Sequence, residues 1–427
     1  MSMVAALGGM VCLCLLAAAC TGAASTHQPT SAAYSDTPAV TPDPTPTGSV
    51  ARVSIVPGDG SANVEPGAGI SVGVAGGTIV RVKVRTEGNP VTGDMDAGRT
   101  AWRSRWALDV DTAYTVSATA VDASGKTVTA TSSFRTLAPA ETFRTTIFEG
   151  YQKTYGVGMP IILTFDRDIQ YKRAVERSLQ VSSSHPVFGA WYWDGDRTLY
   201  FRPRNYWPAN TNVGFIGHLN GVEGAPGVYG VHTLRQSFLV GRSLIAVAST
   251  VSHHVLIYKD RRLFGDWPIS SGKPGDDTPN GTYVTIEKTN PEEMKGPGYD
   301  IMVPWSVRFT WSGDFLHDAF WSVGQQGFAN VSHGCVNLSP EHAKIYYEMS
   351  VPGDPVTITG SPRGGTWGNG WTIWFLSWRD YLRGSALHQA VRVGPKGSSL
   401  VDPSTLPESN AKPPLEVSPP GNASPAS

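Results

Sequence analysis

The sequence predicts a mainly β protein, with two small β-sandwich domains, then a β-rich domain with one helix, and a C-terminal cap segment. Short runs of alternating apolar residues recur along the chain, and this period of two is typical of half-buried strands. Gly, Pro, Asn and Asp separate the runs, as they do at turns. Charged residues make up only 16% of the 427 residues, below the usual quarter, which also favours β structure with many turns.

The N-terminal residues 1–19 have the features of an export signal. Residues 11–19 are apolar, too short to span a bilayer well, and end in small side chains, although no Lys or Arg precedes them. Residues 17–20, three alanines followed by Cys20, resemble a bacterial lipoprotein cleavage box. We therefore expect a lipid on Cys20 that anchors the protein to the outer face of the cell membrane, with plain secretion as the alternative.

A linker and two sandwich domains are expected next. Residues 20–49 are rich in Pro and Thr, cannot bury a core, and predict a disordered linker. The alternating runs that follow predict sandwiches at residues 50–138 and 139–241. In the second, residues 191–193 and 199–201 flank an Asp-Gly-Asp turn and predict a hairpin. Its tryptophans could hold sugar rings, but packing within the sheet is the favoured interpretation.

The third domain is expected at residues 242–360. Ser339 is a good helix N-cap, with Pro340 at the first helical position and an acid after it, so a helix is predicted from there to Met349. The polar stretch 288–299 contains Pro and Gly and suits a mobile loop or lid. Apolar runs predict strands at residues 244–247, 254–258, 283–286 and 356–358.

The C-terminal part divides into a cap and a tail. Residues 361–393 hold four tryptophans, and so much aromatic area predicts a cap segment that docks back on the body. Residues 394–427 are rich in Pro, Ser and Gly and predict a disordered tail.

Cys335 is expected to be the only thiol of the folded body. Of the four cysteines, Cys12 and Cys14 lie in the signal and Cys20 lies at its end. A single remaining cysteine cannot form an intramolecular disulfide, and in an exported protein it indicates a reactive group.

Two histidines accompany this cysteine. The nucleophile is expected to be a thiolate, and a nearby imidazole can take its proton. His333 lies two residues before Cys335, so both side chains share one side of an extended segment, and His317 lies eighteen residues before it. Main-chain N–H groups around Gly334 could stabilise an oxyanion, and Asn337 could fix the loop through its own backbone.

Other interpretations of these residues stay open. Cys335 could be a buried, inert thiol. The cysteine and the two histidines could bind zinc, although no fourth ligand is obvious and the spacing matches no zinc finger. A nucleic-acid partner is not indicated, because the formal net charge is −1 and no basic run is present.

The residues around the cysteine resemble the signature of the L,D-transpeptidase catalytic domain family (YkuD type). The signature combines the run from Ser332 to Cys335, with Asn337 after it, and the distant His317. Supporting pieces are residues 278–282, Thr-Pro-Asn-Gly-Thr, and residues 321–324, Trp-Ser-Val-Gly. The whole arrangement resembles actinobacterial members that carry two immunoglobulin-like domains before the catalytic one.

The resemblance implies peptidoglycan chemistry without a metal or cofactor. In the family, the cysteine attacks a tetrapeptide stem at the L-centre of its diamino acid, and D-alanine leaves. The thioester then passes to the side-chain amine of a neighbouring stem, giving a 3→3 cross-link, and carbapenems acylate the same thiol. Three alternatives remain. The thioester could be delivered to water, as in an L,D-carboxypeptidase, or to a protein amine in wall anchoring, or the protein could be a wall-binding scaffold.

The resemblance also implies roles for individual residues. Asp318 stands where some relatives have a serine, and its main-chain carbonyl is expected to support the neighbouring base. Cys335 is implied as nucleophile, His317 as base and His333 as assisting residue. The remaining residues implied by the family are Ser332, Gly334 and Asn337, which shape the site and oxyanion hole, and Met294, Tyr299, Trp321 and Ser322, which bind substrate.

Overall fold

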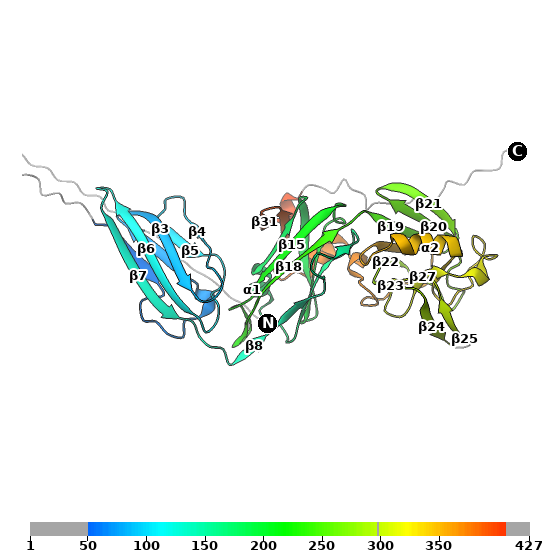
Figure 1. Cartoon of the computed structure of the whole chain (residues 1–427), viewed down its shortest axis with the longest axis horizontal. Helices are drawn as coiled ribbons and strands as arrows, with labels where there is room; N and C mark the ends of the chain where they lie inside the picture. The colour runs from blue at the N-terminus through cyan, green and yellow to red at the C-terminus, as the bar shows by residue number, and fades with distance from the viewer. Residues whose placement is uncertain (1–49, 297–298, 407–427) are drawn as a thin grey trace, which may run out of the picture. The chain divides into compact units, whose positions relative to one another are not determined.

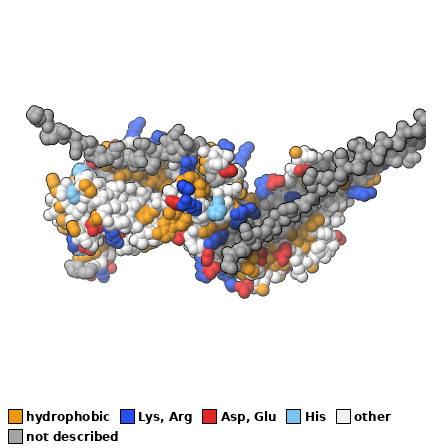
Figure 2. Space-filling model, turned by 180° about the vertical axis from the view of Figure 1, so that it is seen from behind, with side chains coloured by type: hydrophobic (Ala, Val, Ile, Leu, Met, Phe, Trp, Pro, Cys, Tyr) orange, Lys and Arg blue, Asp and Glu red, His pale blue; other side chains and the backbone are white. Residues whose placement is uncertain are grey.

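The structure, a computed structural model, describes residues 50–296 and 299–406. The expected signal, the lipid on Cys20, the linker and the last part of the tail lie outside the described residues. Within these residues strands predominate and helices are few, so the mainly β fold predicted from sequence is confirmed. In the same part of the chain, no helix is long and apolar enough to cross a membrane. Acidic and basic side chains are interspersed on the face shown in Figure 2.

The first sandwich packs two antiparallel sheets, with strand orders β1-β2-β5-β4 and β3-β6-β7. In β6 every second side chain is buried, from Tyr114 through Val116 to Ala120, because alternate residues of a strand face opposite sides. Tyr114, Val116 and Ala118 pack with Trp102 in one core. The strands are β1 (Arg52–Val56), β2 (Ser71–Ala75), β3 (Gly77–Thr86), β4 (Gly93–Met95), β5 (Ala101–Ser104), β6 (Ala113–Asp122) and β7 (Thr127–Arg135).

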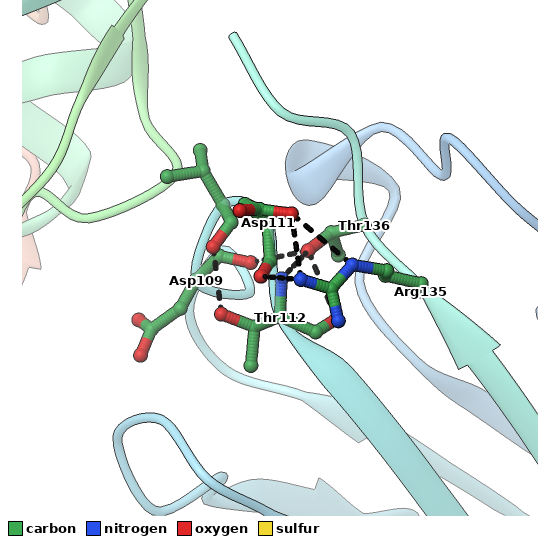
Figure 3. A network of polar contacts seen from close by, with 6 residues as sticks. Asp109, Asp111, Thr112, Arg135 and Thr136 are labelled. Carbon is green, nitrogen blue, oxygen red and sulfur yellow. Dashed lines mark hydrogen bonds and ion pairs between the residues drawn. The ribbon is translucent and has the colours of Figure 1, made fainter.

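A polar network fixes the corner where the chain leaves this sandwich (Figure 3). The Thr136 hydroxyl donates to the Asp109 carbonyl at 2.6 Å and accepts from the Thr112 N–H at 3.0 Å. Arg135 donates from Nη2 to the Asp111 carboxylate at 2.7 Å. The loop before β6 is thereby tied to the end of β7.

The second sandwich has three sheets, with orders β10-β18-β15-β12, β31-β30-β13-β14-β11-β9 and β16-β17-β8. The predicted hairpin is confirmed, since Trp193 on β13 pairs with Leu199 on β14, and both are buried. Its elements are β8 (Glu141–Phe143), β9 (Thr145–Ile147), β10 (Thr154–Tyr155), β11 (Ile161–Phe165), α1 (Lys172–Arg177), β12 (Leu179–Ser183), β13 (Val187–Asp194), β14 (Thr198–Pro203), β15 (Thr211–His218), β16 (Glu223–Ala225), β17 (Val228–Gly230), β18 (Thr233–Val240), β30 (Ala390–Gly394) and β31 (Gly397–Val401).

Two of these strands come from the C-terminal part of the chain (Figure 1). β30 pairs with β13 between Val393 and Val187, and β31 pairs with β30. The sequence-based prediction of a tail from residue 394 onward is therefore wrong for β31. Pairing with a distant strand orders this segment, and no local pattern reveals such a partner.

The cap docks on the second sandwich through two buried charged side chains. The Arg202 guanidinium lies 4.4 Å from the Trp374 ring centre and 4.3 Å from that of Tyr381. Glu176, also buried, accepts from Trp193 Nε1 and from the Ser385 hydroxyl, both at 2.8 Å. The expected docking of this segment is observed, and it includes helix α3 (Trp378–Arg383).

The third domain contains a five-stranded sheet, β21-β20-β19-β29-β22, and a four-stranded sheet, β23-β26-β27-β28. Helix α2 (Pro340–Met349) begins after Ser339, whose hydroxyl accepts from the His342 N–H, as predicted, and it packs on β26, β27 and β28. The strands are β19 (Leu244–Ser249), β20 (His254–Lys259), β21 (Arg262–Pro268), β22 (Gly281–Val284), β23 (Glu287–Thr289), β24 (Glu292–Gly296), β25 (Tyr299–Val303), β26 (Ser306–Arg308), β27 (Phe315–Asp318), β28 (Val336–Leu338) and β29 (Pro355–Thr359).

The segment expected to be a mobile loop or lid contains regular structure. β24 and β25 form an antiparallel hairpin in which Met294 pairs with Ile301 (Figure 1). Gly and Pro made the stretch look irregular in sequence, but residues 292–296 and 299–303 pair across the two strands.

Candidate active site

Two parallel strands bring the cysteine and the distant histidine together. Cys335 directly precedes β28, and β28 runs beside β27 with His317 opposite Asn337. Because side chains alternate along a strand, Cys335, Asn337 and His317 share one face. Val336 and Leu316 face the buried core on the other side. The eighteen-residue separation in sequence is therefore bridged by a single strand pairing.

A pocket of about 370 Å³ opens on this face. It contains all three residues expected to be catalytic and all four expected to bind substrate. Ile301, Val303, Gln325 and Val331 also line it, and the sequence had not singled them out. The complete lining is Met294, Tyr299, Ile301, Val303, His317, Trp321, Ser322, Gln325, Val331, Ser332, His333, Cys335 and Asn337.

His317 is buried and held in one tautomer. Its Nδ1 lies 2.7 Å from the main-chain carbonyl oxygen of Asp318. A carbonyl can only accept, so Nδ1 carries the proton and Nε2 keeps its lone pair. Burial lowers the pKa of His317 to about 4, partly offset by this hydrogen bond. The imidazole is therefore neutral at pH 7 and able to accept a proton.

Burial changes the acidity of the Cys335 thiol. The residue is partly exposed, and its sulfur donates to the Gly313 carbonyl at 3.6 Å. Burial, reinforced by the Asp314 carboxylate, raises the pKa of the Cys335 thiol to about 12, against the smaller effects of the Phe315 N–H and Arg308. This shift favours the neutral thiol, because desolvation disfavours the charged form, so formation of the expected thiolate requires a base that takes the proton.

These pKa shifts predict an unusual pH profile. Since His317 stays neutral down to pH about 4, acylation of Cys335 by a carbapenem should change little between about pH 5.5 and 8. The rate constant is expected to fall only as the pH approaches the lowered pKa. Stopped-flow absorbance or timed intact mass across this range measures it. A fall centred near pH 6.5 would show an imidazole with an ordinary pKa and contradict the prediction.

The loop before the cysteine is fixed by hydrogen bonds from both sides. The Ser332 hydroxyl donates to the Cys335 carbonyl at 2.6 Å and accepts from the Gly334 N–H at 3.2 Å. The Thr278 hydroxyl donates to the Gly334 carbonyl at 2.6 Å. Thr278 belongs to the Thr-Pro-Asn-Gly-Thr run, so that supporting motif holds the cysteine loop.

Gly334 lies beneath the pocket in a conformation that requires glycine. Its φ is +128°, and an added Cβ would stand 2.5 Å from Asp314 Oδ1. The Asp314 carboxylate is held by the Thr310 hydroxyl at 2.7 Å. Asp318 is not among the residues that line the pocket: its side chain is buried, and its main-chain carbonyl supports His317.

The remaining residues implied by the family surround the thiol. Asn337 does not bond its own loop as expected, because its side-chain amide donates to the Ser322 hydroxyl at 3.0 Å. The Trp321 ring lies 6.0 Å from that of His317, and the Tyr299 ring 5.2 Å from that of His333. Among the residues that the structure describes, no group of three His, Cys, Asp or Glu could hold a metal ion.

The sequence reasoning missed Lys273, Gly313 and Asp314. Lys273 Nζ lies 2.8 Å from His333 Nε2. Lys273 lies shortly before Thr278 in the chain. No local pattern in the sequence indicated that its side chain would reach a histidine sixty residues away. Gly313 and Asp314 directly precede β27 and could have been inferred from their place beside His317.

A pocket lined by a cysteine and two histidines lies in a β-rich domain that follows two β-sandwiches, the arrangement that the resemblance to L,D-transpeptidases predicts. Descriptions of known families agree, because "L,D-transpeptidase catalytic domain" matches residues 243–358 and "Bacterial Ig domain" matches residues 61–223. The chain belongs to the L,D-transpeptidase family, with an immunoglobulin-like region before the catalytic domain.

Two relatives from Mycobacterium tuberculosis support this assignment through their sequences. The chain is 36% identical over 349 residues to L,D-transpeptidase 5 of Mycobacterium tuberculosis (strain ATCC 25618 / H37Rv), covering 79% of this chain and 77% of the relative. It is 30% identical over 340 residues to L,D-transpeptidase 2 of M. tuberculosis (strain CDC 1551 / Oshkosh), covering 77% and 83%. A solved L,D-transpeptidase from M. smegmatis shows 31% identity and a TM-score of 0.42, covering 52% of this chain and 100% of that one.

Proposed function

We propose that this protein forms 3→3 cross-links in peptidoglycan through a thioester on Cys335, with release of D-alanine. The observation that supports this most is the shared face of the β27–β28 pair. It places the thiol and a neutral imidazole with a free Nε2 in one accessible pocket. A thiol beside a base is the arrangement needed for covalent acyl transfer.

The acylation step uses His317 as the base. As Sγ bonds to the carbonyl carbon of the donor stem, the thiol proton turns from the Gly313 carbonyl to His317 Nε2. Negative charge develops on the carbonyl oxygen. The Gly334 N–H already binds Ser332, and no hydrogen bond among the described residues is donated by the main-chain N–H of His333 or Cys335. We assign those two N–H groups to the oxyanion.

Collapse of the tetrahedral intermediate breaks the bond between the diamino acid and D-alanine. The imidazolium of His317 gives its proton to the departing amine, and a thioester on Cys335 is left. The side-chain amine of a second stem then attacks the same carbonyl carbon and gives its proton back to His317. Departing sulfur takes that proton, so the thiol is restored and the new amide is the cross-link.

The pocket walls suit a peptide with apolar methylene groups. Met294 and Tyr299 come from the β24–β25 hairpin, and Trp321 stands opposite beside His317. We propose that the hairpin acts as a lid over the donor stem. A carbapenem carbonyl could reach the same thiol and leave a stable acyl adduct.

The proposal places the enzyme outside the cytoplasm. A lipid on Cys20 would anchor it to the outer face of the membrane, and residues 20–49 would hold the body within the wall. We also propose the domain limits 50–138, 139–241 and 242–360, with a cap at 361–393 whose last strand, β30, extends a sheet of the second sandwich.

Product analysis tests the proposed function. The protein is incubated with a disaccharide tetrapeptide, and mass spectrometry follows free D-alanine, tripeptide stems and cross-linked dimers. D-Alanine together with a dimer is the expected result. D-Alanine with tripeptide stems and no dimer would contradict transpeptidation and establish the carboxypeptidase alternative.

A further inference from the structure

Lys273 makes a direct side-chain contact with His333 at the edge of the pocket. Nζ of Lys273 and Nε2 of His333 are 2.8 Å apart, a normal hydrogen-bond distance. An ammonium group has donors only, so Nε2 must be the acceptor. A neutral imidazole that accepts at Nε2 carries its proton on Nδ1.

The lysine is held at both ends. Its main-chain N–H donates to the Ser332 carbonyl at 2.9 Å, and its own carbonyl accepts from the Asp276 N–H at 2.9 Å. The Asp276 carboxylate lies 3.3 Å from Nζ. The side chain is therefore directed at His333 by the same short loop that contributes Thr278.

His333 has few other restraints. It is exposed, and the neighbouring ring of Tyr299, on the lid hairpin, is tilted at 35° to it. An exposed imidazole without a fixed partner would rotate and exchange between its two neutral tautomers. The charged groups that face it are Lys273 and, behind that, Asp276, while Cys335 lies two residues along the chain.

We infer that Lys273 is a positioning residue: it holds His333 as the Nδ1–H tautomer and fixes its ring as a wall of the pocket. The ring then presents one defined donor, Nδ1–H. Fixing the ring also holds the main chain of His333, whose N–H we assign to the oxyanion. The expected effect of Lys273 on the reaction rate rests on the proposed function, whereas its expected effect on the His333 tautomer does not.

Nuclear magnetic resonance tests the tautomer directly. Two-bond proton–nitrogen correlation spectra of the full chain, labelled with ¹⁵N-histidine, distinguish Nδ1–H from Nε2–H. The His333 signals are assigned from their loss in His333→Gln. The wild type should show Nδ1–H, and Lys273→Met should show a mixture of tautomers or mainly Nε2–H. Lys273→Arg retains donors and should keep Nδ1–H.

Kinetics give the second readout. Carbapenem acylation of Lys273→Met should be slowed roughly 10-fold through the maximal rate constant, with a smaller change in half-saturating concentration. Lys273→Arg should recover most of that rate. Lys344→Met removes an equal charge from the surface of α2 and should acylate like the wild type.

Each outcome decides the inference. A wild-type His333 found as Nε2–H, or a spectrum unchanged in Lys273→Met, would overturn it whatever the rates. A shifted tautomer with an unchanged acylation rate would overturn the functional part. If the wild type forms no cross-links, the proposed function fails, while the spectra still report on Lys273.

Discussion

Replacing Cys335 with alanine is expected to abolish acylation by a carbapenem and the release of D-alanine, a fall of about 10⁶-fold in rate. Cys335 is the only free cysteine among the residues that the structure describes, and the other residues around the pocket offer no comparable nucleophile. Intact mass after incubation is the direct measurement, because the wild type should gain the mass of one acyl group and the variant none.

The matched control separates chemistry from folding. Cys335→Ser keeps the size of the side chain and a donor for the Gly313 carbonyl, but a hydroxyl is a far weaker nucleophile beside a neutral imidazole. Both variants should unfold at the wild-type temperature, since the sulfur makes only weak polar contacts, a 3.6 Å hydrogen bond to the Gly313 carbonyl and one from the Phe315 N–H. An acyl adduct on the alanine variant would disprove the assignment of the nucleophile.

Replacing Glu176 with alanine is expected to loosen the cap and destabilise the second sandwich by about 4 kcal/mol. The carboxylate is 3% exposed and accepts hydrogen bonds from Trp193, Ser385 and the main chain of Leu387. Burial raises the pKa of Glu176, and these hydrogen bonds oppose that shift. Without the carboxylate, several buried donors lose their partner at once.

Urea unfolding and hydrogen exchange measure this effect. Exchange should rise first in residues 385–401, which follow the lost contacts along the chain. Glu141→Ala is the matched control, because that glutamate forms an exposed ion pair with Arg167 and its loss should cost less than about 1 kcal/mol. Equal stability of the two variants would show that Glu176 does not hold the cap.

Local chemistry made part of this structure predictable. Ser339 and Pro340 predict the start of α2, and the turn residues 194–196 predict the hairpin around them. The run from Ser332 to Cys335 indicated the site because few other residues in the body can act as nucleophile and base. Each of these signals consists of residues that lie within a few positions of one another in the sequence.

Properties that depend on distant parts of the chain could not be predicted. The raised pKa of the Cys335 thiol results mainly from desolvation by the folded domain. Lys273 reaches His333 across sixty residues. The hairpin of β24 and β25 depends on pairing between these two strands, which the Pro and Gly residues of the segment obscured.

The addition of β30 to the edge of β13 has a consequence for biosynthesis. The second sandwich needs residues that are made only after the entire third domain, so its largest sheet has an open side for much of translation and export. An unpaired strand edge readily associates with other chains. In a polypeptide that stopped at residue 360, the edge of β13 would stay unpaired permanently, even though every residue of the pocket around Cys335 would be present.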